Sequence, residues 1–230
     1  MANYKQDAAK ACLQFLKPLQ VIGLGAGATI AYLVDFIAGD VELANSITFV
    51  SSSFQTRLNL EQKGLKVKMA SQLYAIDIYF DGCDQFDAEL NALKSGGGIH
   101  TSEKILASTA KEFILIGDES KFVPDLDHTY PVVIEILPEA LNIVTVKIED
   151  DFPLATVNLR SGKEKDGAVI SDNGNLLANV KFDELPDIAE LNTYFKMMPG
   201  IVDHSLFYQM ATKAVVAGEH GVRVITPQRF

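Results

Sequence analysis

The sequence is poor in the residues that bind transition metals. It contains two cysteines, Cys12 and Cys83, which do not form a Cys-x-x-Cys pair. Its four histidines show none of the spacings typical of metal ligands; they are His100, His128, His204 and His220. We therefore expect no bound transition metal.

Basic residues are also scarce. The chain has 20 Lys and Arg against 30 Asp and Glu, a formal net charge of −10, and a pI near 4.8. Binding to a nucleic-acid backbone needs a basic face, which this composition hardly supplies. We expect no nucleic-acid partner, and an anionic ligand would have to be held by a few local lysines and backbone N–H groups.

Long apolar runs are missing as well. The longest uncharged apolar run, Val21 to Val34, is too short to span a bilayer, and the first ten residues, "MANYKQDAAK", lack the pattern of a secretory signal. We expect a cytoplasmic protein with no membrane partner. With 230 residues and 48% hydrophobic composition, the chain can bury a core in one large domain, or in one large and one small domain.

Up to about residue 129, strand, loop and helix patterns alternate as in a parallel α/β sheet. An amphipathic helix is predicted from Lys5 to Leu16, and a later one, capped by Thr101 or Ser102, through Lys111. Strands are predicted in the apolar run after Gln20, "QVIGLG", and in "SITFV", and buried-type strands, expected where both faces of a sheet are covered, in "YAIDIYF" and "EFILIGD".

After Pro131 the pattern becomes rich in strands, with one amphipathic helix in "LPDIAELNTYFKMM". The segment "PEALNIVTVKI" fits a strand or a helix, and "KAVVAGEHGVRVI" could return to the first sheet as strand, turn and strand. We predict a Rossmann-like α/β main domain with a mostly parallel sheet (residues 1–129 and 208–230) and a small inserted α+β domain (residues 130–207).

Three glycines, Gly23, Gly25 and Gly27, lie between a predicted strand and a predicted helix. Such glycines let the backbone approach an anion at the N-terminus of the helix. A tight turn serving helix–strand packing is an equal alternative, because the spacing is not the dinucleotide pattern Gly-x-Gly-x-x-Gly. Thr29 adds one hydroxyl donor.

Charged residues cluster in "YFDGCDQFDAELNALKSGGGIHTSEK". Asp81 and Asp84 follow a buried strand, where open α/β sheets place ligand sites, although either could be a solvated loop residue. Lys94 and Gly96 to Gly98 could form an anion-binding nest or a flexible hinge. Glu103, in the first turn of a helix, could be catalytic or could compensate the helix dipole.

Two further residues flank this region. Lys121 could reach the same edge of the sheet, although an exposed lysine is the ordinary case. Cys83 lies between two aspartates, which should raise its pKa and make it a poor nucleophile; it is best interpreted as a packing residue.

These segments together resemble the type A ribose-5-phosphate isomerases through nearly the whole chain. Family-like stretches occur in the family's order: "GLGAGATIAYLV", "SSSFQTR", "DGCDQ", "KSGGG", "SEKI", "DESK", "SDNGNLL" and "MMPGIVDHSLF". The resemblance implies an aldose–ketose isomerase that interconverts ribose 5-phosphate and ribulose 5-phosphate, in the non-oxidative branch of the pentose phosphate pathway. It also implies that neither a metal nor another cofactor is needed, and that the protein is a homodimer or homotetramer.

The resemblance also implies residue roles. Glu103 matches the base that moves a proton between C1 and C2 through a cis-enediolate. Asp81 and Asp84 match residues that handle ring opening and sugar hydroxyls, and Lys94 matches the cation beside the developing oxyanion. Substrate or phosphate contacts are implied for Lys5, Gly25, Ala26, Gly27, Ala28, Thr29, Gly96, Gly97 and Lys121.

The chain departs from the family pattern at a few positions. Alanines replace hydroxyl residues at 26 and 28, which should weaken phosphate binding, and Ser95 replaces a glycine, which would be strained if that position requires a positive φ. Gln85 and Ser205 are the other departures. Two alternatives follow: an isomerase for another sugar or sugar phosphate, or a non-catalytic sugar-phosphate-binding protein.

Overall fold

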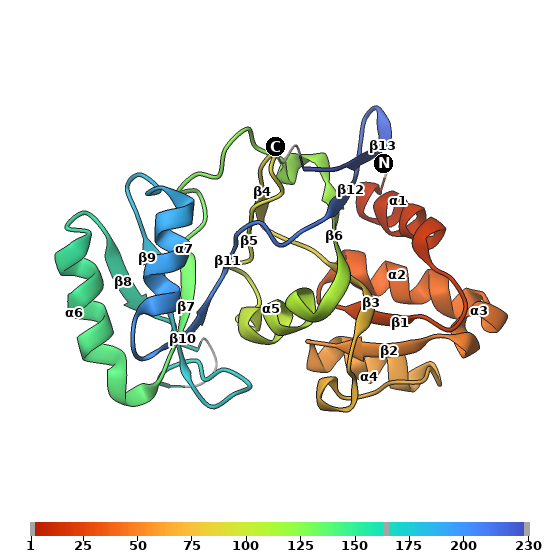
Figure 1. The fold of residues 1–230 in the computed structure, drawn as a ribbon, viewed down its shortest axis with the longest axis horizontal. Coiled ribbons are helices and arrows are strands. Elements are labelled where there is room, and N and C mark those ends of the chain that lie inside the picture. Colours follow the sequence, from red (N-terminus) through yellow and green to blue (C-terminus); the bar gives the residue numbers. More distant parts are fainter. Residues whose placement is uncertain (1–2, 163–165, 228–230) are drawn as a thin grey trace.

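The computed structural model describes residues 3–162 and 166–227 and has two lobes, seen side by side in Figure 1. The larger lobe is built on a six-stranded sheet in the order β13-β12-β6-β3-β1-β2. All neighbours in it are parallel except the antiparallel pair β12 and β13. The strands are β1 Val21–Leu24, β2 Thr48–Ser51, β3 Ile76–Asp81, β6 Ala110–Asp118, β12 Lys213–Gly218 and β13 Gly221–Ile225.

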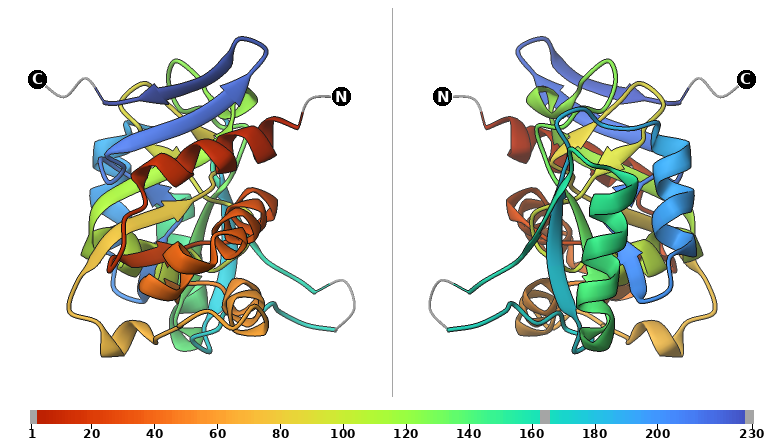
Figure 2. Two further views of the ribbon diagram at one scale, coloured as in Figure 1. Left: turned by 90° about the vertical axis from the view of Figure 1, so that its right-hand side faces the viewer. Right: turned by 90° about the vertical axis from the view of Figure 1, so that its left-hand side faces the viewer.

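Helices cover both faces of this sheet, which explains its nearly continuous apolar strands. In β3, Ile78 and Phe80 belong to one core and Tyr79 to the other. The first core is shared with α1 Tyr4–Ala11, α2 Ala28–Gly39, α3 Val41–Ser46 and α4 Phe54–Gln62, and the second with α5 His100–Thr109. Figure 2 shows α1 lying alongside the sheet, where it contacts β6 and β12.

The smaller lobe is an antiparallel sheet in the order β10-β7-β9-β8. Its strands are β7 Val132–Ile136, β8 Thr156–Leu159, β9 Leu176–Lys181 and β10 Ile201–His204, and its helices are α6 Leu141–Asp151 and α7 Ile188–Met197. The ambiguous segment is therefore helical from Leu141. Val144 and Ile148 lie one turn apart and are both buried in the core of this lobe.

A third, short sheet lies between the lobes in Figure 1, in the order β11-β5-β4. Its strands are β4 Gln85–Phe86, β5 Ala92–Leu93 and β11 Leu206–Phe207. It places the chain after β3 next to the chain that returns from the smaller lobe. The predicted ranges 1–129 with 208–230, and 130–207, contain the strands of the two larger sheets, and the domain division itself stays a prediction. Residues 1–2, 163–165 and 228–230 of these ranges lie outside the described residues.

The predicted capping of α5 is wrong. The helix begins at His100, Ile99 is the N-cap, and no side chain caps it. The Thr101 hydroxyl instead donates to the buried Glu135 carboxylate of β7. The helix ends at Thr109 rather than Lys111, because the next residue, Ala110, already starts β6.

The remaining helical turns are short. They are the 3₁₀ segments η1 Cys12–Phe15, η2 Ala70–Gln72, η3 Glu119–Lys121 and η4 Pro138–Ala140. Within the described ranges, no helix is both long and apolar enough to cross a membrane.

Candidate functional site

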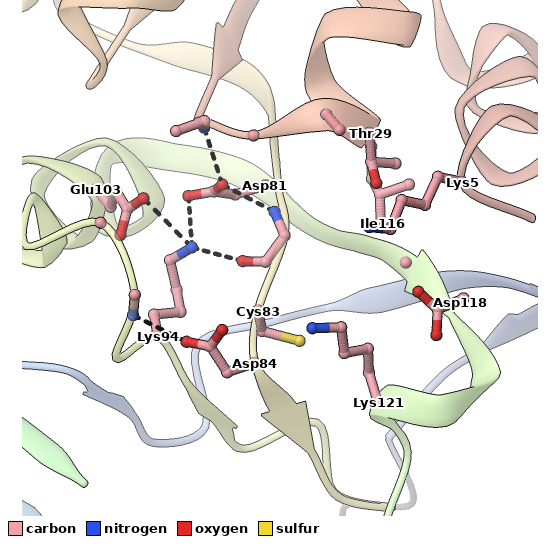
Figure 3. Close-up of a pocket in the computed structure, with 17 residues that line it drawn as sticks. Lys5, Thr29, Asp81, Cys83, Asp84, Lys94, Glu103, Ile116, Asp118 and Lys121 are labelled. Atoms are coloured by element: carbon pink, nitrogen blue, oxygen red, sulfur yellow. Dashed lines mark hydrogen bonds and ion pairs between the residues drawn. The ribbon is translucent and has the colours of Figure 1, made fainter. Parts of the chain in front are cut away.

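A cavity of about 380 Å³ opens at the carboxyl ends of β1, β3 and β6, the edge where open α/β sheets bind ligands. All the predicted site residues line it except Gly25. The lining residues are Lys5, Ala26, Gly27, Ala28, Thr29, Asp81, Gly82, Cys83, Asp84, Lys94, Gly96, Gly97, Glu103, Ile116, Gly117, Asp118 and Lys121. Residues more than 100 positions apart in the sequence are thus brought to one site (Figure 3).

Asp81, the last residue of β3, is 1% exposed and accepts hydrogen bonds on both carboxyl oxygens. The backbone N–H groups of Gly82 and Ala26 donate to Oδ1 at 2.8 and 3.2 Å. The Tyr79 hydroxyl donates to Oδ2 at 2.6 Å, and Lys94 Nζ lies 2.8 Å from the same oxygen. The carboxylate is therefore fixed from four directions.

Two glycines of the predicted anion loop make room for β3 side chains. A Cβ at Gly25 would lie 1.9 Å from Cγ of Asp81, and a Cβ at Gly23 would lie 2.7 Å from Cδ2 of Tyr79. The Gly25 N–H donates to Phe80 O at 2.9 Å, so this N–H is not directed at a ligand. The packing interpretation therefore accounts for Gly23 and Gly25, and only Gly27, with φ of +97°, has the backbone conformation that favours glycine.

Lys94 links the two carboxylates of the site. Its Nζ lies 2.8 Å from Asp81 and 3.4 Å from Oε1 of Glu103, and donates to Gly82 O at 2.5 Å. Burial alone would lower the pKa of Lys94, but the two carboxylates raise it above its ordinary value. Lys94 is therefore a permanent cation beside Glu103 (Figure 3).

Glu103 has the electrostatics of a base that works near neutral pH. It is 6% exposed in the first turn of α5. Burial, and next the charge of Asp81, raise its pKa from 4.5 to about 8, although Lys94 opposes the shift. A carboxylate in this range can both take up and release a proton near neutral pH.

The glycine-rich loop after β5 is held by side chains from both lobes. Asp84 Oδ2 accepts from the Gly96 N–H at 3.0 Å. Arg160, which follows β8, donates to Gly96 O at 3.0 Å and also to Ser95 O. These bonds hold the first half of the loop, Ser95 and Gly96, against Asp84 and Arg160, and whether Gly96 to Gly98 act as a nest or as a hinge stays a prediction.

The opposite side of the cavity is suited to an anion. Lys5 and Lys121 lie there, opposite Glu103 and Asp81 (Figure 3). Ala28 and Thr29 form the first turn of α2, whose N–H groups have no acceptor within the helix. Two ammonium groups, a hydroxyl and a helix N-terminus favour a phosphate or another anion.

The departures from the family pattern are accommodated in the structure. Ser95 is not among the described non-glycine residues with positive φ, and its hydroxyl donates to Pro131 O at 2.5 Å. Gln85 Nε2 donates to Asp127 Oδ1 at 2.8 Å, and Ser205 Oγ accepts from the Val133 N–H at 2.8 Å.

Two other titratable residues, His100 and Cys83, are not suited to acid–base or nucleophilic chemistry. Burial lowers the pKa of His100 to about 4, and its Nε2 lies 3.3 Å from Asp203 O, away from the cavity residues. The pKa of Cys83 is raised to about 12, as predicted, but burial is the first cause and the aspartates are secondary. Within residues 3–162 and 166–227, no three His, Cys, Asp or Glu residues form a group suited to a metal ion.

Three residues at the site were missed in the sequence. Asp118 ends β6 as Asp81 ends β3, so the strand-end rule that selected Asp81 could have found it. Tyr79 lies in the apolar strand β3 and is fully buried, so its sequence pattern indicates only a core residue. Arg160 comes from the other lobe, and nothing in its local sequence places it against the glycine-rich loop.

Comparison with known proteins identifies close relatives. The family model described as ribose 5-phosphate isomerase A (phosphoriboisomerase A) matches residues 48–221. Ribose-5-phosphate isomerase A from Thermosynechococcus vestitus is 37% identical over 220 residues, which cover 94% of this chain and 91% of that protein.

Solved structures agree in fold. A D-ribose-5-phosphate isomerase in complex with phospho-erythronic acid superposes with a TM-score of 0.91 and 32% identity, covering 98% of this chain and all of the other. Ribose 5-phosphate isomerase A from Methanocaldococcus jannaschii has a TM-score of 0.89 and 31% identity, with coverage of 96% and 97%.

Proposed function

The chain belongs to the ribose 5-phosphate isomerase A family, and on that premise we propose that it interconverts ribose 5-phosphate and ribulose 5-phosphate. The observation that carries the proposal is the division of one cavity into two sides. A carboxylate–ammonium–carboxylate cluster lies on one side, and two lysines with a helix N-terminus lie on the other. A phosphorylated pentose fits both sides at once.

We assign the role of base to Glu103. In its carboxylate form it removes the proton from C2 of the open-chain aldose and returns it to C1, through a cis-enediolate. The reverse reaction uses the same carboxyl group. With a pKa of about 8, this group is closely matched to a proton transfer near neutral pH.

The negative oxygen of the enediolate needs a preorganised positive group. Lys94 Nζ lies 3.4 Å from Glu103, so it is close to any atom that exchanges a proton with that carboxylate. It is buried and already held by Asp81 and Gly82 O, so it needs little reorganisation during the reaction. Asp81 and Asp84 are assigned to ring opening and to the sugar hydroxyls.

The phosphate group is assigned to Lys5, Lys121 and the Ala26 to Thr29 turn, with Gly96 and Gly97 on the wall beside the sugar. Binding the phosphate far from C1 and C2 holds the sugar in register with Glu103. A relative of this chain was solved with phospho-erythronic acid, which supports a phosphorylated ligand but not the choice of these residues. The reaction as written requires no metal.

We further propose that residues 130–207 form a separate small domain and that the protein is a homodimer or homotetramer. Large exposed apolar side chains on α6 and α7, among them Ile143 (73% exposed) and Met197 (76%), favour self-association. We also propose a cytoplasmic location, where cysteines such as the free Cys12 and Cys83 stay reduced. Light scattering of the purified protein tests the oligomeric state.

A substrate panel tests the proposed activity. Purified protein is incubated with ribose 5-phosphate, free ribose and a phosphorylated hexose, and ketose formation is followed. We expect rapid conversion of ribose 5-phosphate only. Thermal stabilisation by ribose 5-phosphate without any ketose would refute the enzyme and favour a binding protein, and preference for another sugar would refute the substrate.

A further inference from the structure

Tyr79 is buried beneath the catalytic cluster and does not line the cavity. Its side chain is fully buried, and its ring packs against Phe113 with centroids 5.3 Å apart. Gly23 has no Cβ to collide with this ring. The position of the ring is therefore fixed by the core and not by a ligand.

The Tyr79 hydroxyl belongs to a chain of hydrogen bonds and ion pairs that ends at Glu103. It donates to Asp81 Oδ2 at 2.6 Å, so the Ser52 hydroxyl, 3.1 Å away, must be the donor to the tyrosine oxygen. Lys94 Nζ lies 2.8 Å from the same Asp81 oxygen and 3.4 Å from Glu103. Tyr79 and Lys94 thus share one oxygen of Asp81.

We propose that Tyr79 is a positioning residue of the proposed isomerase: its hydroxyl neutralises part of the charge on Asp81, so that Lys94 stays between the two carboxylates. Without this donor, Asp81 would attract Lys94 more strongly. The positive charge of Lys94 would then act less on Glu103. Glu103 would also face an Asp81 carboxylate whose negative charge is no longer reduced by the tyrosine hydroxyl. The inference rests on the proposed function, because it assigns Glu103 as the base.

Both consequences act on Glu103 in the same direction. The charge of Asp81 already raises the pKa of Glu103, and Lys94 already lowers it. A stronger first effect and a weaker second one raise this pKa further. Tyr79 itself stays protonated, because burial and the neighbouring Asp81 and Glu103 hold its pKa well above the ordinary value.

The other charged groups on the cavity side of Glu103 are left unchanged by a substitution at Tyr79. Glu103 faces Asp81 from β3 and Lys94 from the end of β5, and the rest of the cavity adds Lys5, Asp84, Asp118 and Lys121. On the buried side of α5 lie Glu135, Asp203, His204 and, on the helix itself, His100 and Lys104.

The test is the pH dependence of kcat for the wild type and Tyr79→Phe between pH 5.5 and 10. Phenylalanine keeps the ring and removes only the hydroxyl. We expect the acid limb to move up by about 0.5 to 1 pH unit, which lowers kcat at pH 7 by roughly three- to tenfold. Above about pH 9.5 the kcat values of the wild type and Tyr79→Phe should agree within about twofold. Ser52→Ala should shift the limb in the same direction by less.

The chain provides a matched control. Tyr194 OH donates to Asp151 Oδ2 at 2.9 Å in the smaller lobe, so Tyr194→Phe removes a tyrosine–aspartate bond outside the cavity. We expect no change in its acid limb. A second measurement, independent of turnover, is the ¹³C carboxyl titration of Glu103, assigned with Glu103→Gln, in the wild type and Tyr79→Phe.

The outcomes separate the two claims. The positioning role is supported if the acid limb of kcat and the pKa of Glu103 both move to higher pH in Tyr79→Phe and stay unchanged in Tyr194→Phe. A uniform loss of kcat at every pH, or no loss, overturns it while leaving the isomerase intact. An inactive wild type overturns the proposed function, and the titration then decides on its own whether Tyr79 sets the pKa of Glu103.

Discussion

The substitution Gly25→Ala tests whether this glycine is required by Asp81. The added Cβ would lie 1.9 Å from Cγ of Asp81 and 1.9 and 2.3 Å from its two oxygens. Asp81 is 1% exposed and accepts from four donors. The carboxylate cannot move away without losing some of these bonds.

The size of the effect follows from the geometry. Ordinary contact begins near 3.4 Å, so the carboxyl carbon must retreat by about 1.5 Å (3.4 − 1.9). Misplacement of a catalytic group by ~1 Å costs on the order of a hundredfold in rate, and overpacking a core costs about 1–3 kcal/mol. We expect kcat/KM to fall by at least ~100-fold and Tm to fall by about 3–10 °C.

The assay is a double-mutant cycle of Gly25→Ala with Asp81→Ala. The second change removes the three atoms that the new Cβ meets, so the double mutant should regain stability lost in Gly25→Ala but not activity. Gly39→Ala is the control, because its added Cβ would meet nothing within 4 Å beyond the neighbouring residues and the backbone of its own helix. A Gly25→Ala variant with wild-type activity and Tm would show that Asp81 does not require a glycine at position 25.

Three further predictions concern charge, the loop and the phosphate. Folding raises the pKa of Glu103 from 4.5 to about 8, so protonated Glu103 stabilises the fold below pH 4.5 and this stabilisation is lost as pH rises to about 8. Over this range, the Tm of Glu103→Gln should therefore fall less than that of the wild type. The kcat of the wild type should rise with pH to a plateau above about pH 8. Arg160→Met removes the donors to Ser95 O and Gly96 O and should lower kcat/KM by about tenfold. An unchanged kcat/KM would show that the glycine-rich loop keeps its conformation without Arg160. Ala28→Ser adds a hydroxyl at the phosphate end and should lower KM for ribose 5-phosphate by about fivefold, with no effect on the affinity for free ribose.

Local sequence patterns were sufficient to predict most of the fold. The alternating strands and helices of the main sheet are present, and the end of the chain returns to it as β12 and β13. The segment from Leu141 to Asp151 was ambiguous because β-branched residues fit a strand, and only packing of Val144 and Ile148 on the small sheet decides for a helix. The cap of α5 was mispredicted because Thr101 has a tertiary partner, Glu135.

The site divides in a similar way. Asp81, Lys94 and Glu103 were selected by position and by resemblance, and they lie together in the cavity. The reason for Gly25 was not visible in the sequence, because its constraint comes from a side chain 56 residues later. Arg160 was equally hidden, since its contact with the glycine-rich loop exists only when the two lobes pack together.

In the proposed reaction the Glu103 carboxylate moves the proton. The most direct measurement is conversion of ribose 5-phosphate by the wild type and Glu103→Gln in the presence of a chelator, with thermal stabilisation by the sugar phosphate as the binding control. We expect chelator-resistant turnover by the wild type, and a loss of about a thousandfold in the Glu103→Gln variant, which should still bind the sugar phosphate. Turnover by Glu103→Gln within about tenfold of the wild type would contradict it.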